Sequence, residues 1–349
     1  MGSFLRRCVD QVTDALGRSR GLPRVDIFKR VIPTVWFVGT SGVGKTTVGS
    51  QLQNTLERRG TRAAFVDADQ LRNTAGVEST EDELVADGLR AITPEFERAG
   101  AQVLIVAGMV DDEASLARLV PEDPRSNLFV VHLHAADQTV VDRVVRRQWN
   151  VELANDSVEY SQNFDRGWVD VTIDTTELST AEVVERLIER VEAMAKPPRI
   201  PDSEPIMPPA VGTVVTVVTG AGGVGLSAAG FLTFLQGMWG GERIGYVDSH
   251  QVGFVGVDPR ATELAPLRAR NAVAVAAVMA RRGVEHVVVT ADPATSKALV
   301  EVAHPATVFW LDASDHAIES RHRARAAGGG PHLAGDHRLG LDENGIQAG

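Results

Sequence analysis

The sequence is poor in cysteine and in long apolar runs, and each shortage excludes a class of protein. A single cysteine, Cys8, occurs among 349 residues, so neither a disulfide framework nor a cysteine-based metal site is available. No stretch of 18 uncharged apolar residues occurs, and the arginines at positions 6 and 7 precede no apolar segment of signal length. The composition therefore predicts a cytoplasmic protein with no membrane partner.

Basic residues are outnumbered by acidic ones, with 35 Lys and Arg against 46 Asp and Glu. The formal net charge is −11 and the isoelectric point is near 5.3, which opposes any binding mode that neutralises many phosphates of a polynucleotide. We therefore expect no nucleic-acid partner. Only four lysines occur, namely Lys29, Lys45, Lys196 and Lys297. A lysine inside a glycine-rich loop is correspondingly unexpected by chance.

Such a lysine occurs in the segment GTSGVGKTT, residues 39–47, which matches the pattern G-x-x-x-x-G-K-[ST]. The segment follows an apolar, β-branched run at 34–39 and precedes an amphipathic stretch at 46–60, so it joins a strand to a helix. Glycines allow consecutive N–H groups to point at phosphate oxygens, Lys45 reaches the outer phosphates, and the Thr46 hydroxyl ligates Mg²⁺. The expected phosphate contacts are Gly39, Thr40, Ser41, Gly42, Val43, Gly44, Lys45, Thr46 and Thr47.

Strand and helix patterns alternate from residue 33 to residue 195, which predicts a parallel sheet covered by helices on both faces. The second strand ends in VDADQLR (66–72), and ligands of open α/β sheets lie at the carboxyl ends of strands. We therefore expect Asp67 to hold Mg²⁺ or accept a proton, and Asp69 to fix the acceptor. A solvated strand end or a helix N-cap would use the same residues. Asp111 or Asp112, after the third strand, could be a metal-linked acid of the Walker-B kind, but a turn or a helix N-cap would use the same residues.

The same plan recurs after a proline-rich segment. GERIGYVDSHQ (241–251) matches GTRAAFVDADQ (60–70), and Asp248 lies as far from Gly220 as Asp67 lies from Gly39. A repeat near 181 residues fits duplication of a whole domain. The fold class predicted is α/β, with two tandem P-loop NTPase-type three-layer α/β/α domains built on parallel sheets. The expected division is an N-terminal helical extension (1–32), an active domain (33–195), a linker (196–210), a degenerate domain (211–330) and a glycine-rich tail (331–349).

The second glycine loop, GAGGVGLSA (220–228), carries Leu226 where the first carries Lys45. Leucine cannot offset phosphate charge, so phosphoryl transfer there should be severely weakened. The loop also satisfies G-x-G-x-x-G, with Asp248 at the end of the next strand, so an NAD(P)-binding C-terminal domain stays an alternative. The register of the repeat favours a pseudokinase.

The segment 37–72 resembles the opening of the adenylylsulfate-kinase and gluconate-kinase group of small P-loop kinases, and VTIDTTELSTAEVVERL (171–187) is similar to its closing strand, turn and helix. The resemblance covers about residues 33 to 195 and implies that Arg72 and Arg90 are substrate-side arginines. It also assigns Arg143, Arg146 and Arg147 to a lid that closes over the phosphates. The acceptor motif F-T-G-I-D-x-P-Y-E of adenylylsulfate kinases is absent, so that activity is not expected.

The sequence thus predicts an ATP- and Mg²⁺-dependent kinase for a small-molecule acceptor, with catalysis in the N-terminal domain. Lys45, Asp67, Arg143 and Arg147 would be catalytic, Thr46 and Asp67 would hold the metal, and Asp69, Arg72 and Arg90 would bind the acceptor. A nucleotide-dependent switch or scaffold ATPase is the alternative from another functional class. The acceptor, ATP against GTP preference and homodimer formation stay open.

Overall fold

The computed structural model describes residues 32–120, 125–146, 153–198, 213–256, 258, 261–303 and 306–326. The chain divides into residues 1–31 and 32–349, and every described residue belongs to the second of these units. The expected N-terminal extension, apart from Ile32, therefore lies outside the described residues. So do the linker beyond residue 198 and the glycine-rich tail.

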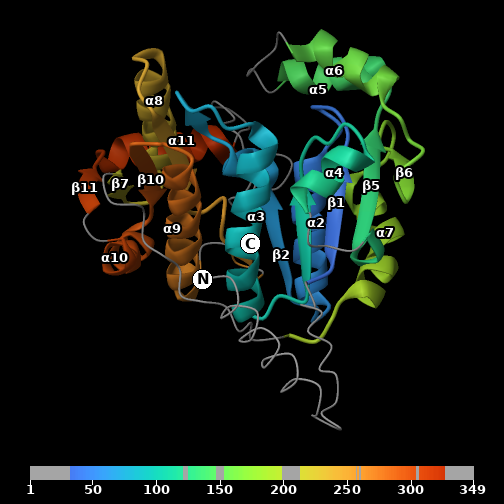
Figure 1. Cartoon of the computed structure of the whole chain (residues 1–349), viewed down its shortest axis with the longest axis horizontal. Helices are drawn as coiled ribbons and strands as arrows, with labels where there is room; N and C mark the ends of the chain where they lie inside the picture. Colours follow the sequence, from blue (N-terminus) through green and yellow to red (C-terminus); the bar gives the residue numbers. More distant parts are fainter. Residues whose placement is uncertain are drawn as a thin grey trace, which may run out of the picture. The chain divides into compact units, whose positions relative to one another are not determined.

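The first half of the chain builds a six-stranded sheet in the order β6-β5-β1-β4-β2-β9 (Figure 1). Its five strands from the first half run parallel, with β1 in the middle paired to both β4 and β5. Both faces of β1 are buried, as a parallel sheet with helices on each side requires. The bounds of these strands are β1 (Thr34–Val38), β2 (Ala63–Asp67), β4 (Val103–Ala107), β5 (Leu128–His134) and β6 (Val171–Asp174).

Helices of the first half begin where the sequence supplies caps. Thr80 and Ser179 each form a capping box with the glutamate three residues later, which fixes the starts of α3 and α7. The apolar side of α7 packs with α2 against one face of the sheet. The helices are α2 (Lys45–Arg58), α3 (Glu81–Arg98), α4 (Glu113–Leu119), α5 (Asp137–Arg146), α6 (Leu153–Asn163) and α7 (Thr180–Met194), with short 3₁₀ turns η1 (Ala68–Leu71) and η2 (Arg125–Asn127).

The second half builds a separate five-stranded sheet in the order β11-β7-β10-β8-β3. Its own four strands are parallel and follow the order of β5-β1-β4-β2 in the first half. Within the described residues, no strand or helix corresponds to β6 and α7. The elements are β7 (Val214–Gly220), α8 (Leu226–Trp239), β8 (Ile244–Asp248), η3 (Thr262–Leu264), α9 (Ala265–Arg281), β10 (His286–Ala291), α10 (Pro293–Val302), β11 (Ala306–Leu311) and α11 (Asp315–Ala326).

The two halves exchange short edge strands, so both sheets are mixed rather than purely parallel. From the second half, β9 (Phe254–Val255) pairs antiparallel with β2, and the Phe254 ring packs against Phe65. From the first half, β3 (Thr74–Ala75) pairs antiparallel with β8. A strand of two residues carries too little pattern to be recognised in a sequence, so the exchange was not expected. The pairing covers an edge of each sheet that would otherwise be open.

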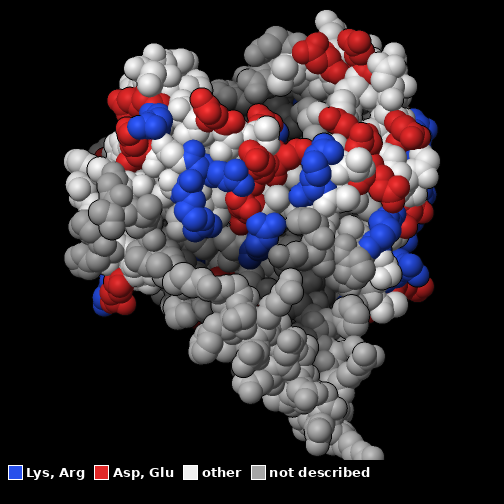
Figure 2. All heavy atoms as spheres, in the orientation of Figure 1, with Lys and Arg blue, Asp and Glu red and all other residues white. Residues whose placement is uncertain are grey.

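The helices α3 and α9 lie side by side between the two sheets (Figure 1). The buried carboxylate of Glu95 on α3 contacts Arg98 and accepts a hydrogen bond from Arg270 Nε of α9 at 2.6 Å. Arg282, directly after α9, is 2.6 Å from Asp87 and 3.4 Å from Glu83. Figure 2 shows basic and acidic side chains next to one another along this contact. Charge complementarity therefore fixes how these helices meet.

Glu57 connects the helix of the glycine-rich loop to the second half. Its Oε1 accepts hydrogen bonds from the backbone N–H of Ala63 at 2.9 Å and of Gly256 at 3.0 Å.

We expect Glu57→Ala to lower the free energy of unfolding by about 2 kcal/mol, because two backbone donors lose a charged acceptor. Glu57→Gln keeps an acceptor oxygen and should lose less than half as much. Urea unfolding of both variants tests this, and equal stabilities for Glu57→Ala and the wild type would refute it.

Candidate functional site

The loop between β1 and α2 has the backbone conformation of an anion nest. Gly42 and Gly44 take positive φ angles of 88° and 94°, which side-chain-bearing residues rarely adopt. A Cβ on Gly39 would overlap the carbonyl oxygen of Leu133, so the loop also packs tightly against the end of β5. No side chain caps the first turn of α2 at Gly44. The N–H groups of this turn are thus suited to bind an anion.

Lys45 lies across the mouth of this loop. Its Nζ donates hydrogen bonds to the carbonyl oxygens of Gly39 and Thr40, each at 2.8 Å. The ammonium group is therefore held beside the nest by the loop's own backbone. This arrangement places a fixed positive charge where the outer phosphates of a bound nucleotide would need one.

Thr46 and Asp67 meet at the carboxyl edge of the sheet. The Thr46 hydroxyl donates to Asp67 Oδ2 at 2.8 Å, and Asp67 Oδ1 accepts from the Asp69 N–H at 3.0 Å. A hydroxyl and a carboxylate side by side suit Mg²⁺, which binds one or two protein oxygens together with phosphates and water. The described residues include no cluster of three or more His, Cys, Asp or Glu that could hold a metal without such help. The donor set thus fits a nucleotide-bound Mg²⁺.

Arg72 and Arg90, the two arginines expected to bind the acceptor, both form ion pairs. Arg72 Nη2 lies 2.6 Å from Asp69 Oδ1, and its Nη1 contacts Glu81 at the start of α3. Arg72 and Asp69 thus lie together, next to Asp67. Arg90 lies 2.6 Å from Asp87, the residue that also binds Arg282 at the contact with α9. Its ion pair therefore connects Arg90 to the contact between the halves.

The arginines expected in a lid begin on α5, the helix that packs against the glycine-rich loop. A Cβ on Gly42 would meet Val140 and Val144 of this helix. Arg143 Nη1 donates to Thr175 Oγ1 at 3.0 Å and Nη2 to the Thr175 carbonyl at 2.8 Å. Arg147 lies outside the described residues, as does the side chain of Arg146.

Thr175 is a residue that the sequence did not single out. Its buried hydroxyl lies 3.2 Å from the carbonyl oxygen of Val43 in the glycine-rich loop and 3.0 Å from that of His134. These two contacts and the bonds from Arg143 connect Thr175 to three segments: the loop, the end of β5 and α5. Its place directly after β6, at the same sheet edge as the other strand ends, was the available signal.

The two acids after β4 have different surroundings. Asp112 caps α4 by accepting the Ser115 N–H at 2.6 Å, and this bond lowers the pKa of its carboxyl. The N-cap interpretation therefore holds for Asp112. Burial and the neighbouring Asp111 raise the pKa of the Tyr160 hydroxyl, which donates to the Val110 carbonyl at 3.1 Å. Asp111 thus lies beside α6, near the end of β4.

The second glycine loop resembles the first in backbone conformation but has different polar contacts, since Arg321 Nη1 donates to the carbonyl oxygens of Gly223 at 3.2 Å and Val224 at 2.9 Å. Gly223 and Gly225 have φ angles of 87° and 91°, close to those of Gly42 and Gly44. Leu226 begins α8 without a side-chain cap. Among the described residues, Ser227 and Asp248 make no bond like that of Thr46 and Asp67, although Asp248 accepts the His250 N–H at 3.0 Å as Asp67 accepts that of Asp69.

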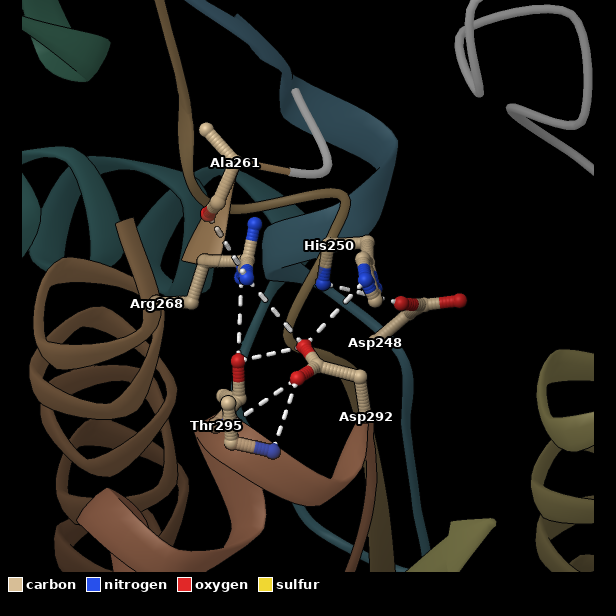
Figure 3. Close-up of polar contacts among 7 residues, drawn as sticks. Asp248, His250, Ala261, Arg268, Asp292 and Thr295 are labelled. Atoms are coloured by element: carbon tan, nitrogen blue, oxygen red, sulfur yellow. Dashed lines mark hydrogen bonds and ion pairs between the residues drawn. The ribbon is translucent and has the colours of Figure 1, made fainter. Parts of the chain in front are cut away.

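A buried ion-pair network lies beside Asp248 (Figure 3). Arg268 is 1% exposed, lies 3.3 Å from Asp292 and donates to Thr295 Oγ1 at 3.0 Å. The pKa of Asp292 stays below its usual value, because Thr295 and Arg268 stabilise the charged form more than burial opposes it. His250 Nε2 lies 3.4 Å from the same carboxylate. These side chains bind one another at the carboxyl ends of β8 and β10.

Comparisons with known proteins found one family model and several solved structures that are similar to the first half. Residues 35–162 match the family model described as AAA domain, while the curated protein sequences contain no match. Among solved structures, the chain is similar to APE1195 (16% identity, TM-score 0.37, 47% of this chain and 96% of that one) and to a gluconokinase from Sinorhizobium meliloti 1021 (21%, 0.34, 48% and 95%). It is also similar to the Mycobacterium tuberculosis APS kinase in complex with AMPPNP and APS (19%, 0.31, 46% and 98%).

The N-terminal half therefore contains a P-loop domain, and the chain is an α/β protein with two largely parallel sheets. Each of these solved structures corresponds to about half of this chain. No helix among the described residues is long and apolar enough to cross a bilayer.

His132 provides a pH-dependent test of the packing beside the P-loop. Its ring stacks on Phe164 at 4.3 Å, and burial, reinforced by Arg166, His134 and Lys45, lowers its pKa from 6.5 to about 4. The folded state thus keeps His132 neutral, whereas the unfolded chain gains a proton below pH 6.5. Stability should fall by roughly 1–3 kcal/mol between pH 6.5 and 4, and this part of the loss should vanish in His132→Phe. Identical pH profiles of urea unfolding for both proteins would contradict this assignment.

Proposed function

We propose that the chain is an ATP- and Mg²⁺-dependent kinase for a small-molecule acceptor, with catalysis in residues 33–195. The observation that carries the proposal is the glycine-rich loop at residues 39–47 with its lysine. Lys45 is held at its mouth, and the Thr46 hydroxyl meets the Asp67 carboxylate beside it. A glycine-rich turn without ligand would need neither contact.

The residues divide the work as follows. The N–H groups of residues 39–47 and the Lys45 ammonium position the phosphates, and Thr46 with Asp67 would hold the metal, which neutralises phosphate charge when bound. Arg143, fixed by Thr175, stabilises charge on the transferred group as α5 closes. Arg147 would share this role. Asp67 also lies at the site where an attacking hydroxyl must lose its proton.

The charges around Asp69 favour an acceptor of a particular kind. Arg72, the expected substrate-binding arginine, is already neutralised by Asp69 and Glu81. Asp67 adds a further carboxylate close by. Because an anionic acceptor would meet more negative than free positive charge here, a neutral or cationic hydroxyl compound suits the site better. Arg90 can join acceptor binding only by sharing its bond with Asp87.

The second half, residues 211–330, supports the proposal as a degenerate copy of the first. It repeats the strand order and the glycine-loop conformation, yet it lacks the lysine and the hydroxyl–carboxylate bond. Its remaining role is structural: β8 pairs with β3, the strand that directly follows the acceptor segment 67–72. We therefore propose a pseudokinase that braces the acceptor segment of its active partner.

A switch or scaffold ATPase would use the same P-loop without an acceptor. The exchange of edge strands is the feature that favours it, because nucleotide binding at α2 could reach the second half through Glu57 and Gly256. Initial rates of ATP consumption with and without a panel of hydroxyl compounds separate the two functions. Stimulation by an acceptor supports the kinase, whereas a constant background rate supports the switch.

Lys45→Ala tests the catalytic half, and the chain offers its own control in Leu226→Ala at the equivalent position. Removing the ammonium should lower kcat for ATP consumption by about 100- to 1,000-fold, since a fixed charge on the transferring group is lost. The Leu226 variant should keep the wild-type rate. Steady-state kinetics with purified full-length proteins measure both. A Lys45→Ala enzyme that consumes ATP at the wild-type rate would eliminate the proposal.

Asp67→Asn tests the metal role. The amide keeps the size of the side chain and an acceptor oxygen for Thr46 but removes the charge that attracts Mg²⁺. The Mg²⁺ concentration giving half-maximal activity should rise about tenfold or more, whereas Asp248→Asn should leave it unchanged. The readout is a Mg²⁺ titration of activity at fixed ATP. An unchanged Mg²⁺ dependence in Asp67→Asn would assign the metal to other residues.

A further inference from the structure

The second half exposes a large apolar surface around its last described strand. We call the side chains Val214, Leu232, Trp239, Val308, Phe309 and Trp310 the β11 surface. Trp239, Trp310 and Phe309 are 72%, 63% and 58% exposed, and the three aliphatic members are about half exposed. Side chains alternate between the faces of a strand, so Phe309 lies on the face covered by α8 and Val308 and Trp310 lie on the opposite face. Large apolar side chains exposed on both faces of an edge strand indicate an interaction site.

The first half shows what normally covers this position. There, β6 pairs with the outer edge of β5, and α7 packs against α2 and the neighbouring strands. In the second half, β11 pairs with β7 on one edge only, and no described element lies where β6 and α7 would lie. The apolar side chains and the outer backbone edge of β11 are therefore both left open among the described residues.

Charge restricts what can bind there. The strand ATVFWL (306–311) and the helix LSAAGFLTFLQGMW (226–239) contain no charged residue. Edge strands of soluble proteins usually carry lysine, proline or another device that prevents pairing, and β11 carries none of these. The partner must therefore offer an uncharged apolar surface with an open strand edge of its own. The β11 surface of another copy meets all these requirements.

The exposed area is sufficient for such an association. The three aromatic side chains together expose about 400 Å², taking about 200 Å² for each full ring system. This is about half of the roughly 800 Å² that each partner contributes to a stable interface. The aliphatic side chains and the strand backbone supply further area.

We infer that two copies of the chain form a twofold-symmetric dimer by antiparallel pairing of β11 with β11. A twofold axis lets each strand satisfy the open edge of the other. Phe309 then packs across the axis on the face of the joined sheet that carries α8, and Val308 and Trp310 pack on the opposite face. The chain already uses antiparallel edge pairing between its own halves, at β2–β9 and β3–β8. The dimer joins two five-stranded sheets into one ten-stranded sheet. This inference is independent of the proposed catalytic function.

Sedimentation velocity of the full-length protein between about 0.5 and 100 μM tests the dimer. The wild type should sediment as a dimer, and Trp310→Lys should raise the dimer dissociation constant at least 100-fold, because like charges then face each other across the axis. Phe309→Lys should act in the same way. Both side chains are exposed in the single chain, so circular dichroism should show an unchanged fold. Met109→Lys, a similarly exposed apolar position in the first half, is the matched control and should stay dimeric.

Hydrogen exchange of residues 306–311 identifies the surface. Protection that rises with protein concentration in the wild type and is lost in Trp310→Lys supports the dimer. A wild type that is monomeric throughout overturns the inference, and protection of these amides in such a monomer means that another segment of the same chain covers them. A dimer that both lysine variants leave intact also overturns it, since another surface must then be responsible.

Discussion

The hydrogen bond between Thr46 and Asp67 joins the start of α2 to the end of β2, and the proposed chemistry depends on it. It places a hydroxyl and a carboxylate together at the sheet edge, next to a loop whose helix start has no side-chain cap. The parallel sheet makes this possible, because all its strands deliver their carboxyl ends to one edge. Lys45 lies beside Thr46 at the same edge, and Thr175 and Arg143 reach it from two further segments.

Much of this arrangement could be predicted from the sequence. The alternation of strands and helices, the loop at 39–47 and the strand end at Asp67 depend on local patterns, and the structure places them as expected. The strand exchange could not be predicted, because β3 and β9 are two residues long and are fixed by the other half of the chain. The ion pairs of Arg72 with Glu81 and of Arg90 with Asp87 could not be predicted either, because nothing in the sequence distinguishes these two acids from the other acids of the same helix.

The second half has the same order of parallel strands as the first, and we propose that it is a copy without the site. Gly223 and Gly225 repeat the loop conformation, whereas Leu226 stands in place of the lysine and, among the described residues, Ser227 makes no bond to Asp248. The contacts that the second half makes with the first explain why the chain would keep it. It supplies β9 to the first sheet, receives β3 after the acceptor segment, and sets Arg270 against the buried Glu95. Removing it would expose an edge strand and leave Glu95 without one of its two cations.

The central claim is that one P-loop per chain, the loop with Lys45, binds the nucleotide. Isothermal titration of Mg²⁺ and a non-hydrolysable ATP analogue into the full-length protein measures this directly. The account predicts one nucleotide bound per chain. Two per chain would contradict the degeneracy of the second half, and none would contradict the assignment of residues 39–47 as a nucleotide site.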